Sequence, residues 1–186
     1  MTLAVALLAA GGATRFGGGK LDAECAGKPL GQWALDAVLA LPHARLAVVV
    51  SEPAPTFARH CELLVNERAS EGLGTSAALA AHWAAGCDAL LIVLADMPLV
   101  SSATLRKLAA GDGPVAVAYP GGKPGAPARF PAALLPALAA LTGDSGAAQV
   151  LRGLADVTRI ETSPEELRDV DRPEDRADVA AILRSR

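Results

Sequence analysis

The stretch LAVALLAAGGATRFGGGK, residues 3–20, combines a short apolar run with a glycine-rich loop that contains two cations. The run from Leu3 to Leu8 carries no charge and has the length of a strand, which is typical of a parallel strand buried on both faces. The glycines that follow allow the backbone to approach a ligand closely, while Arg15 and Lys20 supply cationic donors. The stretch therefore predicts a buried strand that leads into a phosphate-binding loop.

Two better-known phosphate loops do not fit this stretch. A Walker A loop that ends at Lys20 would need Gly at position 14 and Ser or Thr at position 21, where the chain has Thr14 and Leu21. A dinucleotide fingerprint would need Gly at position 22, which is Asp22. An ordinary surface loop with two solvated cations is the alternative, since loops are commonly rich in glycine. The position directly after the first strand favours the phosphate-binding loop, because ligands of α/β sheets collect at the carboxyl ends of strands.

Further along the chain, short β-rich runs alternate with Ala- and Leu-rich stretches, which predicts one α/β domain, residues 1–186, with a mostly parallel sheet covered on both faces. Strands are expected at Leu3–Leu8, Leu46–Val50, Glu62–Val65, Ala89–Leu94, Val115–Tyr119 and Val157–Ile160. Helices are expected at Leu30–Leu41, Thr56–His60, Thr75–Ala85, Ser102–Ala109, Pro131–Leu141, Gly146–Leu154 and Pro173–Ser185. The Gly- and Pro-rich segment 111–130 is expected to form loops around the strand at 115–119.

Composition excludes several classes of partner. The net charge is -3 and the pI about 5.6, with acids and bases interspersed and no basic stripe, so a nucleic-acid polymer is not expected as a partner. The three cysteines, Cys25, Cys61 and Cys87, match neither a disulfide framework nor a metal knuckle, and we expect reduced thiols. No Lys or Arg precedes the first apolar run and no apolar stretch approaches about 20 residues, so we expect a cytoplasmic protein without a membrane partner.

An acidic residue follows the second strongly apolar run of the chain. The run Leu90 to Leu94 predicts a buried strand, and Asp96 comes two residues after it. A carboxylate at the carboxyl end of a strand faces the ligand crevice, and Mg²⁺ prefers one or two carboxylates together with phosphate oxygens. Asp96 is therefore the first candidate for a metal ligand.

Acids also crowd the start of the last expected helix, where Pro173 fits the first helical position. Capping of this helix is the expected role of Asp169, Glu174 and Asp175, and Asp171 also lies where an N-cap belongs. The loop from Glu71 to Ser76 opens another helix, so its free N–H groups and hydroxyls can either meet a polar ligand or serve as ordinary caps. The histidines share no metal-ligand spacing, and the serines lack the elbow that acyl transfer requires.

The glycine-rich loop resembles the Leu-Ala-Ala-Gly-x-x-x-Arg-x-Gly-x-x-Lys signature of nucleotidyltransferases, most closely the cytidylyltransferases of the molybdenum cofactor nucleotidyltransferase family. The resemblance implies a Rossmann-like, three-layer αβα sandwich of the nucleotide-diphospho-sugar transferase type. It implies that the base and ribose are lined by Leu8, Ala9, Ala10, Gly11 and Gly12, and that the triphosphate is held by Arg15 and Lys20.

Three further motifs extend the resemblance over nearly the whole chain. Asp171 matches the second Asp of the family's Asp-x-Asp-Thr-Pro-Glu-Asp motif, which implies that Asp96 and Asp171 bind Mg²⁺, although Arg172 replaces the Thr. A loop that borders the nucleotide is matched at Gly72, Gly74 and Ser76. The segments Gly121–Phe130 and Gly143–Ala147 are implied to face the second substrate, where the family has an Arg at the position of Ala148 and the next cation here is Arg152.

The implied reaction transfers CMP from CTP to the phosphate of molybdopterin and releases pyrophosphate, with Lys20, Arg15 and Asp96 as catalytic residues. Ala10 favours CTP over GTP because guanylyl relatives have Gly there and a Cβ narrows the space beside the base. GTP nevertheless stays open as the substrate. A sugar-phosphate or methylerythritol-phosphate nucleotidyltransferase also stays open, as does a non-catalytic carrier that delivers finished cofactor to a molybdenum hydroxylase.

Overall fold

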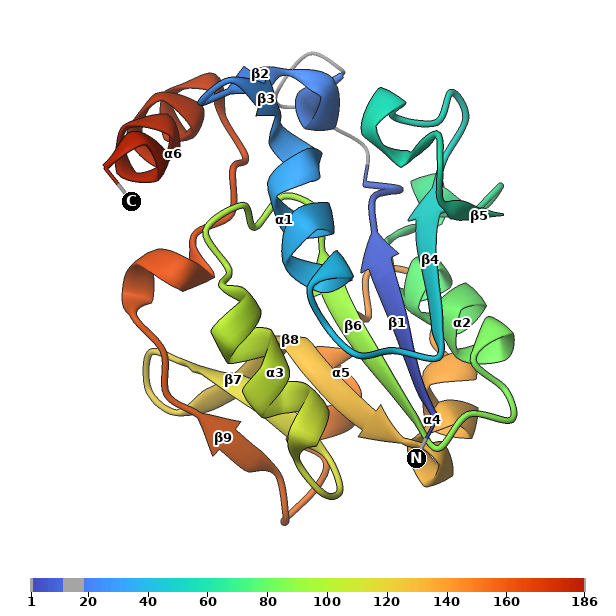
Figure 1. Cartoon of the computed structure of the whole chain (residues 1–186). Helices are drawn as coiled ribbons and strands as arrows, with labels where there is room; N and C mark the ends of the chain where they lie inside the picture. Colours follow the sequence, from blue (N-terminus) through green and yellow to red (C-terminus); the bar gives the residue numbers. More distant parts are fainter. Residues whose placement is uncertain (1, 12–18, 186) are drawn as a thin grey trace.

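The computed structural model describes residues 2–11 and 19–185, which form three layers with a sheet in the middle (Figure 1). The sheet has seven strands in the order β5-β4-β1-β6-β8-β7-β9. Its strands are β1 (Leu3–Leu8), β4 (Arg45–Val50), β5 (Glu62–Val65), β6 (Ala89–Leu94), β7 (Val115–Tyr119), β8 (Lys123–Pro131) and β9 (Thr158–Ile160). A separate small ribbon pairs β2 (Glu24–Cys25) with β3 (Lys28–Pro29) in antiparallel fashion.

The sheet is mostly parallel, as the alternation of strands and helices predicts. Strand β1 pairs in parallel with β4 and β6, β4 with β5, and β7 with β9. All six residues of β1 are buried, and they alternate between the two faces, with Leu3, Val5 and Leu7 in one core and Ala4, Ala6 and Leu8 in the other. A strand with both faces covered must be apolar at every position, which explains the continuous run in the sequence.

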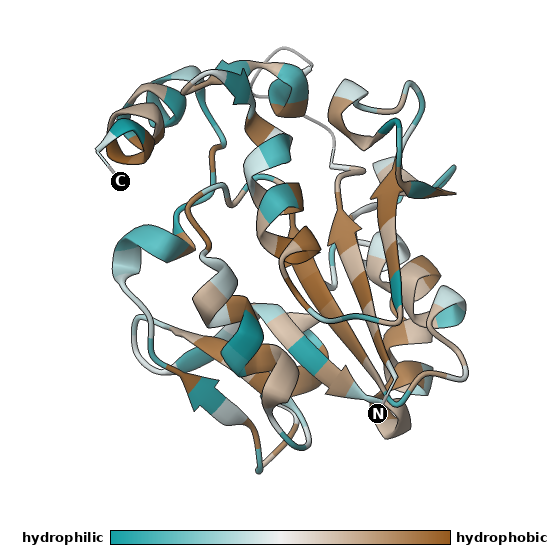
Figure 2. Ribbon diagram, in the orientation of Figure 1, coloured by the Kyte–Doolittle hydropathy of each residue, from teal (hydrophilic) through white to brown (hydrophobic). Residues whose placement is uncertain are grey.

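Helices cover both faces of the sheet. The core on one face contains residues of α1, α3 and α6, and the core on the other contains residues of α2, α4 and α5. Figure 2 shows the apolar strands of the sheet behind α1 and α3, which carry hydrophilic residues on the sides that face the viewer. The helices are α1 (Leu30–Leu39), α2 (Leu73–Trp83), α3 (Ser102–Ala110), α4 (Leu135–Ala139), α5 (Ala148–Arg152) and α6 (Pro173–Arg184). These layers confirm the predicted fold class.

The expectation of loops over the later part of segment 111–130 is wrong, because β8 runs from Lys123 to Pro131 between β6 and β7 and is antiparallel to both. Proline lacks an N–H and normally interrupts a central strand. Here the pairing of β7 with β8 shifts between Ala116 and Val117, and Ala126 and Pro127 fall in this irregularity. Because the bulge accommodates Pro127, the proline does not interrupt β8, and the Gly- and Pro-rich sequence does not indicate a loop here.

Several expected helices are shorter in the structure. The stretch from Pro131 to Leu141 divides into a 3₁₀ turn at Ala132–Leu134 and the five-residue α4. The expected helix at Thr56–His60 is a 3₁₀ turn at Thr56–Ala58, and α5 begins two residues later than expected. Within residues 2–11 and 19–185, no helix combines the length and apolar character that crossing a membrane requires.

Candidate active site

The strand order reverses between β1 and β6, and this is the point where open α/β sheets bind ligands. Backbone pairing continues one residue past both strands, because the N–H of Ala9 donates to Val49 O at 2.7 Å and the N–H of Ala95 donates to Leu8 O at 3.0 Å. The backbone that leads to Ala10 and Asp96 is therefore held by the sheet itself. The Cα atoms from which the side chains of Ala10 and Asp96 extend are thus held at the carboxyl edge of the sheet.

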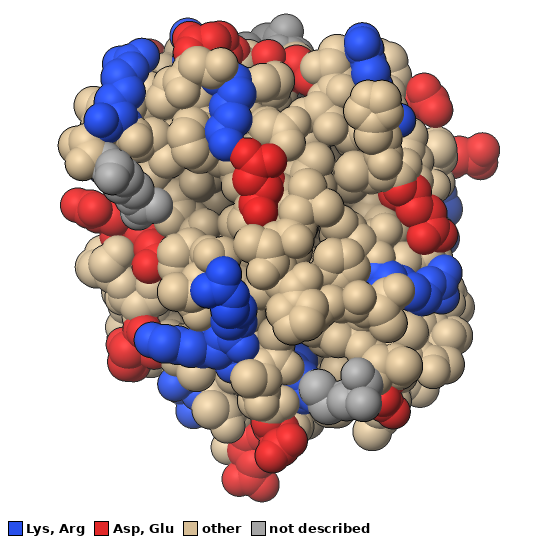
Figure 3. Space-filling model, viewed as in Figure 1, with Lys and Arg blue, Asp and Glu red and all other residues tan. Residues whose placement is uncertain are grey.

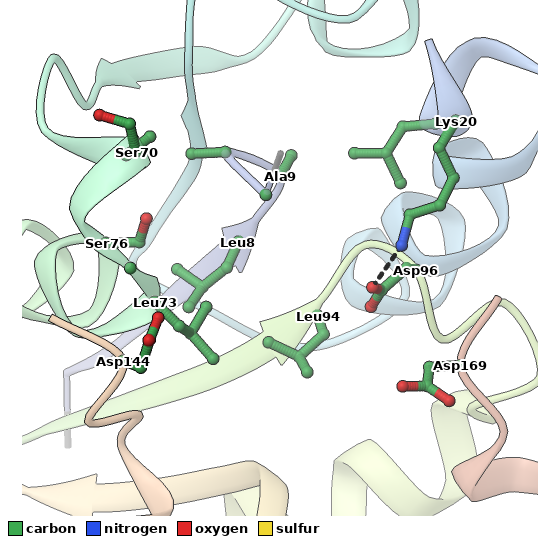
Figure 4. A pocket seen from close by; sticks show the side chains of 15 residues that line it. Leu8, Ala9, Lys20, Ser70, Leu73, Ser76, Leu94, Asp96, Asp144 and Asp169 are labelled. Carbon is green, nitrogen blue, oxygen red and sulfur yellow. Dashed lines mark hydrogen bonds and ion pairs between the residues drawn. The ribbon is translucent and has the colours of Figure 1, made fainter. Parts of the chain in front are cut away.

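A cavity of about 650 Å³ opens at this edge, which is within the usual range of ligand pockets. Its walls come from the ends of β1 and β6, the turn before α2, and two loops that approach from the later half of the chain (Figure 4). The lining residues are Leu8, Ala9, Ala10, Gly11, Lys20, Leu21, Ala69, Ser70, Gly72, Leu73, Ser76, Leu94, Asp96, Asp144 and Asp169. Most of the residues predicted to contact a nucleotide therefore share one cavity.

Lys20 forms an ion pair with each of the two predicted metal ligands, which lie 76 and 151 positions further along the chain. Its Nζ lies 2.9 Å from Asp96 Oδ2 and 3.4 Å from Asp171 Oδ1. Burial disfavours the charge on Lys20, but attraction to and hydrogen bonds with Asp96 and Asp171 outweigh that cost and raise the pKa of the ammonium. The Lys20 side chain is 12% exposed and that of Asp171 is 49% exposed, so the cluster is closed on the lysine side and open on the Asp171 side.

The segment before α6 brings Asp171 to the end of β6. Val170 is fully buried, and its N–H donates to the carbonyl of Asp96 at 3.0 Å. Asp171 does not cap α6, because Arg172 occupies the N-cap position and the carboxylate of Asp175 accepts from the N–H groups of Asp171 and Arg172 at 3.1 and 2.8 Å. The expected capping role is confirmed for Asp175, and the Asp171 side chain is left to contact Lys20.

Asp169 lies in the cavity wall and caps no helix, so the capping role expected for it is wrong (Figure 4). Burial raises the pKa of its carboxyl, and the nearby carboxylates of Asp171 and Asp96 raise it further. Sequence reasoning missed this residue. The available signal was the pattern Asp-Val-Asp, because a buried Val170 turns its two neighbours away from the core.

The loop before α2 is held against the loop at 142–145. Gly72 has a φ of +124°, and a Cβ on it would come within 2.3 Å of the Gly143 carbonyl carbon. The N–H of Gly74 donates to Gly143 O at 2.9 Å, and a Cβ on Gly74 would meet backbone oxygens at 2.8 Å. This contact places Asp144 on the cavity wall near Leu73 (Figure 4). Gly72 and Ser76 line the cavity, whereas Gly74 lies behind its wall and packs the two loops together.

Two of the predicted nucleotide contacts, Gly12 and Arg15, lie outside the described residues. The other residues predicted to contact the base, Leu8, Ala9, Ala10 and Gly11, lie side by side along the cavity. In the part of the chain that the structure describes, no group of three or more His, Cys, Asp and Glu residues is arranged to hold a metal. Cys25, Cys61 and Cys87 are free thiols, as expected.

A second, mainly apolar cavity of about 330 Å³ adjoins the first and shares Leu8, Leu73 and Leu94 with it. Its remaining walls come from β6, from the β7–β8 hairpin, and from α5 with the two residues before it. They consist of Ile92, Tyr119, Lys123, Pro124, Gly125, Ala126, Gly146, Ala147, Ala148 and Arg152. Both segments that the family resemblance assigned to a second substrate thus contribute to this cavity. Arg152 also lines it, one helical turn after Ala148, the position at which the family has an arginine.

Enzymes that act on phosphorylated nucleotides commonly have a mostly parallel α/β sheet. They carry glycine-rich turns, a lysine and acidic residues at the switch point of that sheet. Both the fold and the cavity at β1 and β6 place this chain in that class. The chain belongs to the family described as the MobA-like NTP transferase domain, whose model matches residues 5–159. The protein is accordingly an enzyme of the nucleotidyltransferase class.

Solved structures share the fold over the full length of the chain. A nucleotidyl transferase from Methanothermobacter thermautotroptrophicus is 22% identical, with a TM-score of 0.84 and coverage of 100% of this chain and 99% of the other. Rv0371c from Mycobacterium tuberculosis, in complex with manganese, is 20% identical, with a TM-score of 0.77 and coverage of 97% and 99%. Molybdopterin-guanine dinucleotide biosynthesis protein A from Archaeoglobus fulgidus is 16% identical, with a TM-score of 0.69 and coverage of 98% and 100%. At these identities the likeness concerns the fold. No curated protein matches the sequence.

Proposed function

We propose that the protein transfers a nucleoside monophosphate, preferably CMP from CTP, to the phosphate of molybdopterin and releases pyrophosphate. The observation that carries this proposal is the meeting of Lys20 with Asp96 and Asp171 at one end of the 650 Å³ cavity. One ammonium and two carboxylates from distant parts of the chain gather there, beside the end of the first strand. A triphosphate with its divalent ion needs this combination of charges.

We propose Asp96 and Asp171 as the residues that would hold Mg²⁺. Oxygens of both carboxylates lie within 3.4 Å of a single cationic atom, Lys20 Nζ, so the pair already surrounds a position of positive charge. Mg²⁺ is usually bound by one or two carboxylates and completes its shell with water and substrate phosphates, so a third protein ligand is not required. The exposure of Asp171 leaves room for those oxygens. When bound, the ion would neutralise charge on the phosphates.

The roles of the chain's own residues follow from charge and position. An oxygen of the acceptor phosphate attacks the α-phosphorus of the nucleotide, and the bond between the α-phosphorus and the oxygen that bridges to pyrophosphate breaks. The acceptor phosphate is already ionised, so no general base is required. Lys20 stabilises the charge that develops on the leaving pyrophosphate, and we assign the same role to Arg15. Positioning and charge stabilisation supply the acceleration.

Cytosine is proposed as the base because Ala10, and not a glycine, lies in the cavity wall. Ala10 is 3% exposed and lines the cavity beside Ala9 and Gly11. Its Cβ narrows the space in which a base would lie, and a pyrimidine is smaller than a purine. A single methyl group usually changes discrimination by about 1–3 kcal/mol, which supports a preference for CTP over GTP.

The second cavity supports molybdopterin as the acceptor class. It adjoins the first cavity through Leu8, Leu73 and Leu94, so a ligand in each would meet at the shared wall. Its walls are mainly apolar and suit a planar ring, while Lys123 and Arg152 supply positive charge for a phosphate.

We propose that residues 1–186 work as one domain in the cytoplasm, a compartment that suits the free thiols of Cys25, Cys61 and Cys87.

Pyrophosphate release measured with CTP, GTP, ATP and UTP, each with Mg²⁺ and molybdopterin, tests this proposal. Release that is fastest with CTP and that requires molybdopterin would support it. Fastest release with GTP would correct the base, and release only with a sugar phosphate or methylerythritol phosphate would replace the acceptor. Tight binding of molybdopterin cofactor with no release from any triphosphate would overturn the enzyme proposal in favour of a carrier for a molybdenum hydroxylase.

A further inference from the structure

Asn66 lies behind the cavity wall and contacts three polar groups there. It is 7% exposed, follows the last residue of β5, and its N–H donates to Val50 O at 2.7 Å. The side-chain Nδ2 lies 2.9 Å from both Thr75 Oγ1 and Ser76 Oγ, and Oδ1 accepts from the N–H of Arg68 at 3.0 Å. Asn66 does not itself line the 650 Å³ cavity, whereas Ser76 does.

The chemistry of its neighbours permits only one orientation of the Asn66 amide. The Thr75 hydroxyl lies 2.9 Å from Gly72 O and 3.0 Å from Arg68 O, and carbonyl oxygens only accept. The single hydroxyl proton of Thr75 is directed to these carbonyls, so Thr75 Oγ1 must accept from Asn66. The N–H of Arg68 can only donate, so it must meet Oδ1. Nδ2 therefore faces both hydroxyls, with one proton for each.

This orientation determines what Ser76 can do. Its Oγ accepts the second proton of Nδ2, so its own hydroxyl proton is left for another acceptor. Among the residues that the structure describes, no hydrogen bond donated by the Ser76 hydroxyl is found. Ser76 is 3% exposed and lines the cavity, so a ligand bound there can accept this proton.

Figure 4 shows Ser76 and Lys20 on opposite sides of the cavity. If the triphosphate lies at Lys20, as the proposed function requires, the nucleoside lies on the side of Ser76. Cytosine presents two acceptors, O2 and N3, on the edge that pairs in nucleic acids. A donor directed into this end of the cavity matches such an edge.

We propose that Asn66 is a positioning residue that holds Ser76 as a hydrogen-bond donor to the nucleobase. The role rests on the proposed function, because it requires a nucleotide in the 650 Å³ cavity. Asn66 acts through Ser76 and touches no substrate. It makes the donor permanent, since every other arrangement of protons leaves a buried group of this network without a partner.

Substitutions at the two positions separate the base contact from the phosphate contact. Ser76→Ala removes the donor, and Asn66→Asp keeps the shape but cannot donate to both hydroxyls, whether its carboxyl is ionised or protonated. We expect each change to weaken CTP binding about 2- to 10-fold, in line with one net hydrogen bond. Binding of tripolyphosphate, which has no base, should remain unchanged in both. Ser102→Ala, at the first turn of α3 outside both cavities, is the matched control.

The double variant gives the decisive comparison. Because Asn66 acts through Ser76, Asn66→Asp should cause no further loss of CTP affinity once Ser76→Ala is present. Calorimetric titrations with Mg²⁺ measure each affinity, and melting temperatures report folding. Additive losses, an unchanged CTP affinity in Asn66→Asp, or equal losses for CTP and tripolyphosphate would each overturn the positioning role. A wild-type protein that binds none of the four triphosphates would instead overturn the proposed function, and this inference with it.

Discussion

At the scale of single residues, Lys20 is the residue on which the account depends most. It is held between Asp96 and Asp171, which arrive from the end of β6 and from the segment before α6. Two carboxylates this close would repel each other, and the ammonium compensates that repulsion in the free protein. The same three groups become available to a triphosphate and a divalent ion when those ligands bind.

Removing the ammonium should therefore affect catalysis more than folding. Lys20→Ala is expected to lower kcat about 10²- to 10³-fold, because charge stabilisation at the transferring phosphoryl group is lost. Steady-state assays of pyrophosphate release measure the effect, with Lys107→Ala on α3 as a control that removes a surface lysine outside both cavities. Near-normal turnover of the Lys20 variant would remove this residue from the mechanism.

Asp169 predicts a pH-dependent change in stability. Its pKa in the folded protein is raised above the ordinary 3.8, so the fold favours the neutral carboxyl. The stabilisation is complete below pH 3.8 and is lost as the pH rises through the folded-state pKa, so at pH 7 the ionised Asp169 destabilises the fold.

Asp169→Asn cannot ionise and should raise the free energy of unfolding at pH 7. The gain should be roughly 0.2–1 kcal/mol, because the residue is exposed and water screens the repulsion. Urea unfolding in the presence of a chelator at pH 7 and pH 4 provides the measurement. The gain should shrink toward pH 4, and a gain of the same size at both values would exclude the electrostatic explanation.

Arg152 is expected to act on the acceptor. Arg152→Ala should raise KM for molybdopterin about 10-fold or more and leave kcat and the affinity for CTP nearly unchanged, because one charge-assisted contact to the acceptor phosphate is lost. Arg106→Ala, an exposed arginine of α3 outside both cavities, is the control. Equal effects of the two substitutions would argue against an acceptor in the second cavity.

At the scale of elements, the turn before α2 and the loop at 142–145 form the least obvious part of the site. Their contact depends on the absence of a side chain at Gly72, where φ is +124° and the Gly143 backbone is close. The two loops are about 70 positions apart, and only their contact brings Asp144 to the cavity. Sequence reasoning identified both loops by resemblance, but it could not find the contact between them.

Gly72→Ala tests this contact. The substitution adds backbone strain and a clash with backbone atoms, and we expect it to lower the free energy of unfolding by about 1–3 kcal/mol or more. Gly86→Ala is the matched control, because Gly86 also has a positive φ, +88°, but nothing lies within 4 Å of the added Cβ. Denaturant unfolding of both variants separates strain from the clash. A Gly72 variant no less stable than the Gly86 variant would mean that the loops do not depend on close packing.

Strands that form long, uninterrupted apolar runs are predicted accurately from the sequence, whereas elements with short or mixed patterns of apolar and polar residues are not. Strands β1 and β6 were placed at their observed bounds, because complete burial requires an uninterrupted apolar run. Strand β8 was missed, since its prolines and glycines indicate loops and only the bulge in its pairing with β7 accommodates them. Asp96 follows from the expectation that a carboxylate at the end of a strand faces the ligand crevice, whereas the pairing of Asp171 with Asp96 comes from the family resemblance alone. Asp169 was missed because acids before a helix usually cap it.

At the scale of the whole molecule, acidic and basic side chains are interspersed on the face in Figure 3, which shows no large patch of one sign. The two adjoining cavities lie on the carboxyl side of the sheet, and the helices of both outer layers pack against that sheet. The molecule thus supplies a fixed edge on which substrates of a nucleotidyl transfer can be placed next to each other.

The central claim is that Asp96 and Asp171 act with Lys20 to hold a triphosphate and its divalent ion together. The most direct test is the affinity for CTP by calorimetry, with and without Mg²⁺, for the wild type and for the double variant Asp96→Asn/Asp171→Asn. We expect Mg²⁺ to strengthen CTP binding to the wild type at least 10-fold, a coupling of about 1.4 kcal/mol, and to have little effect on the variant. An equal strengthening in both proteins would contradict the account.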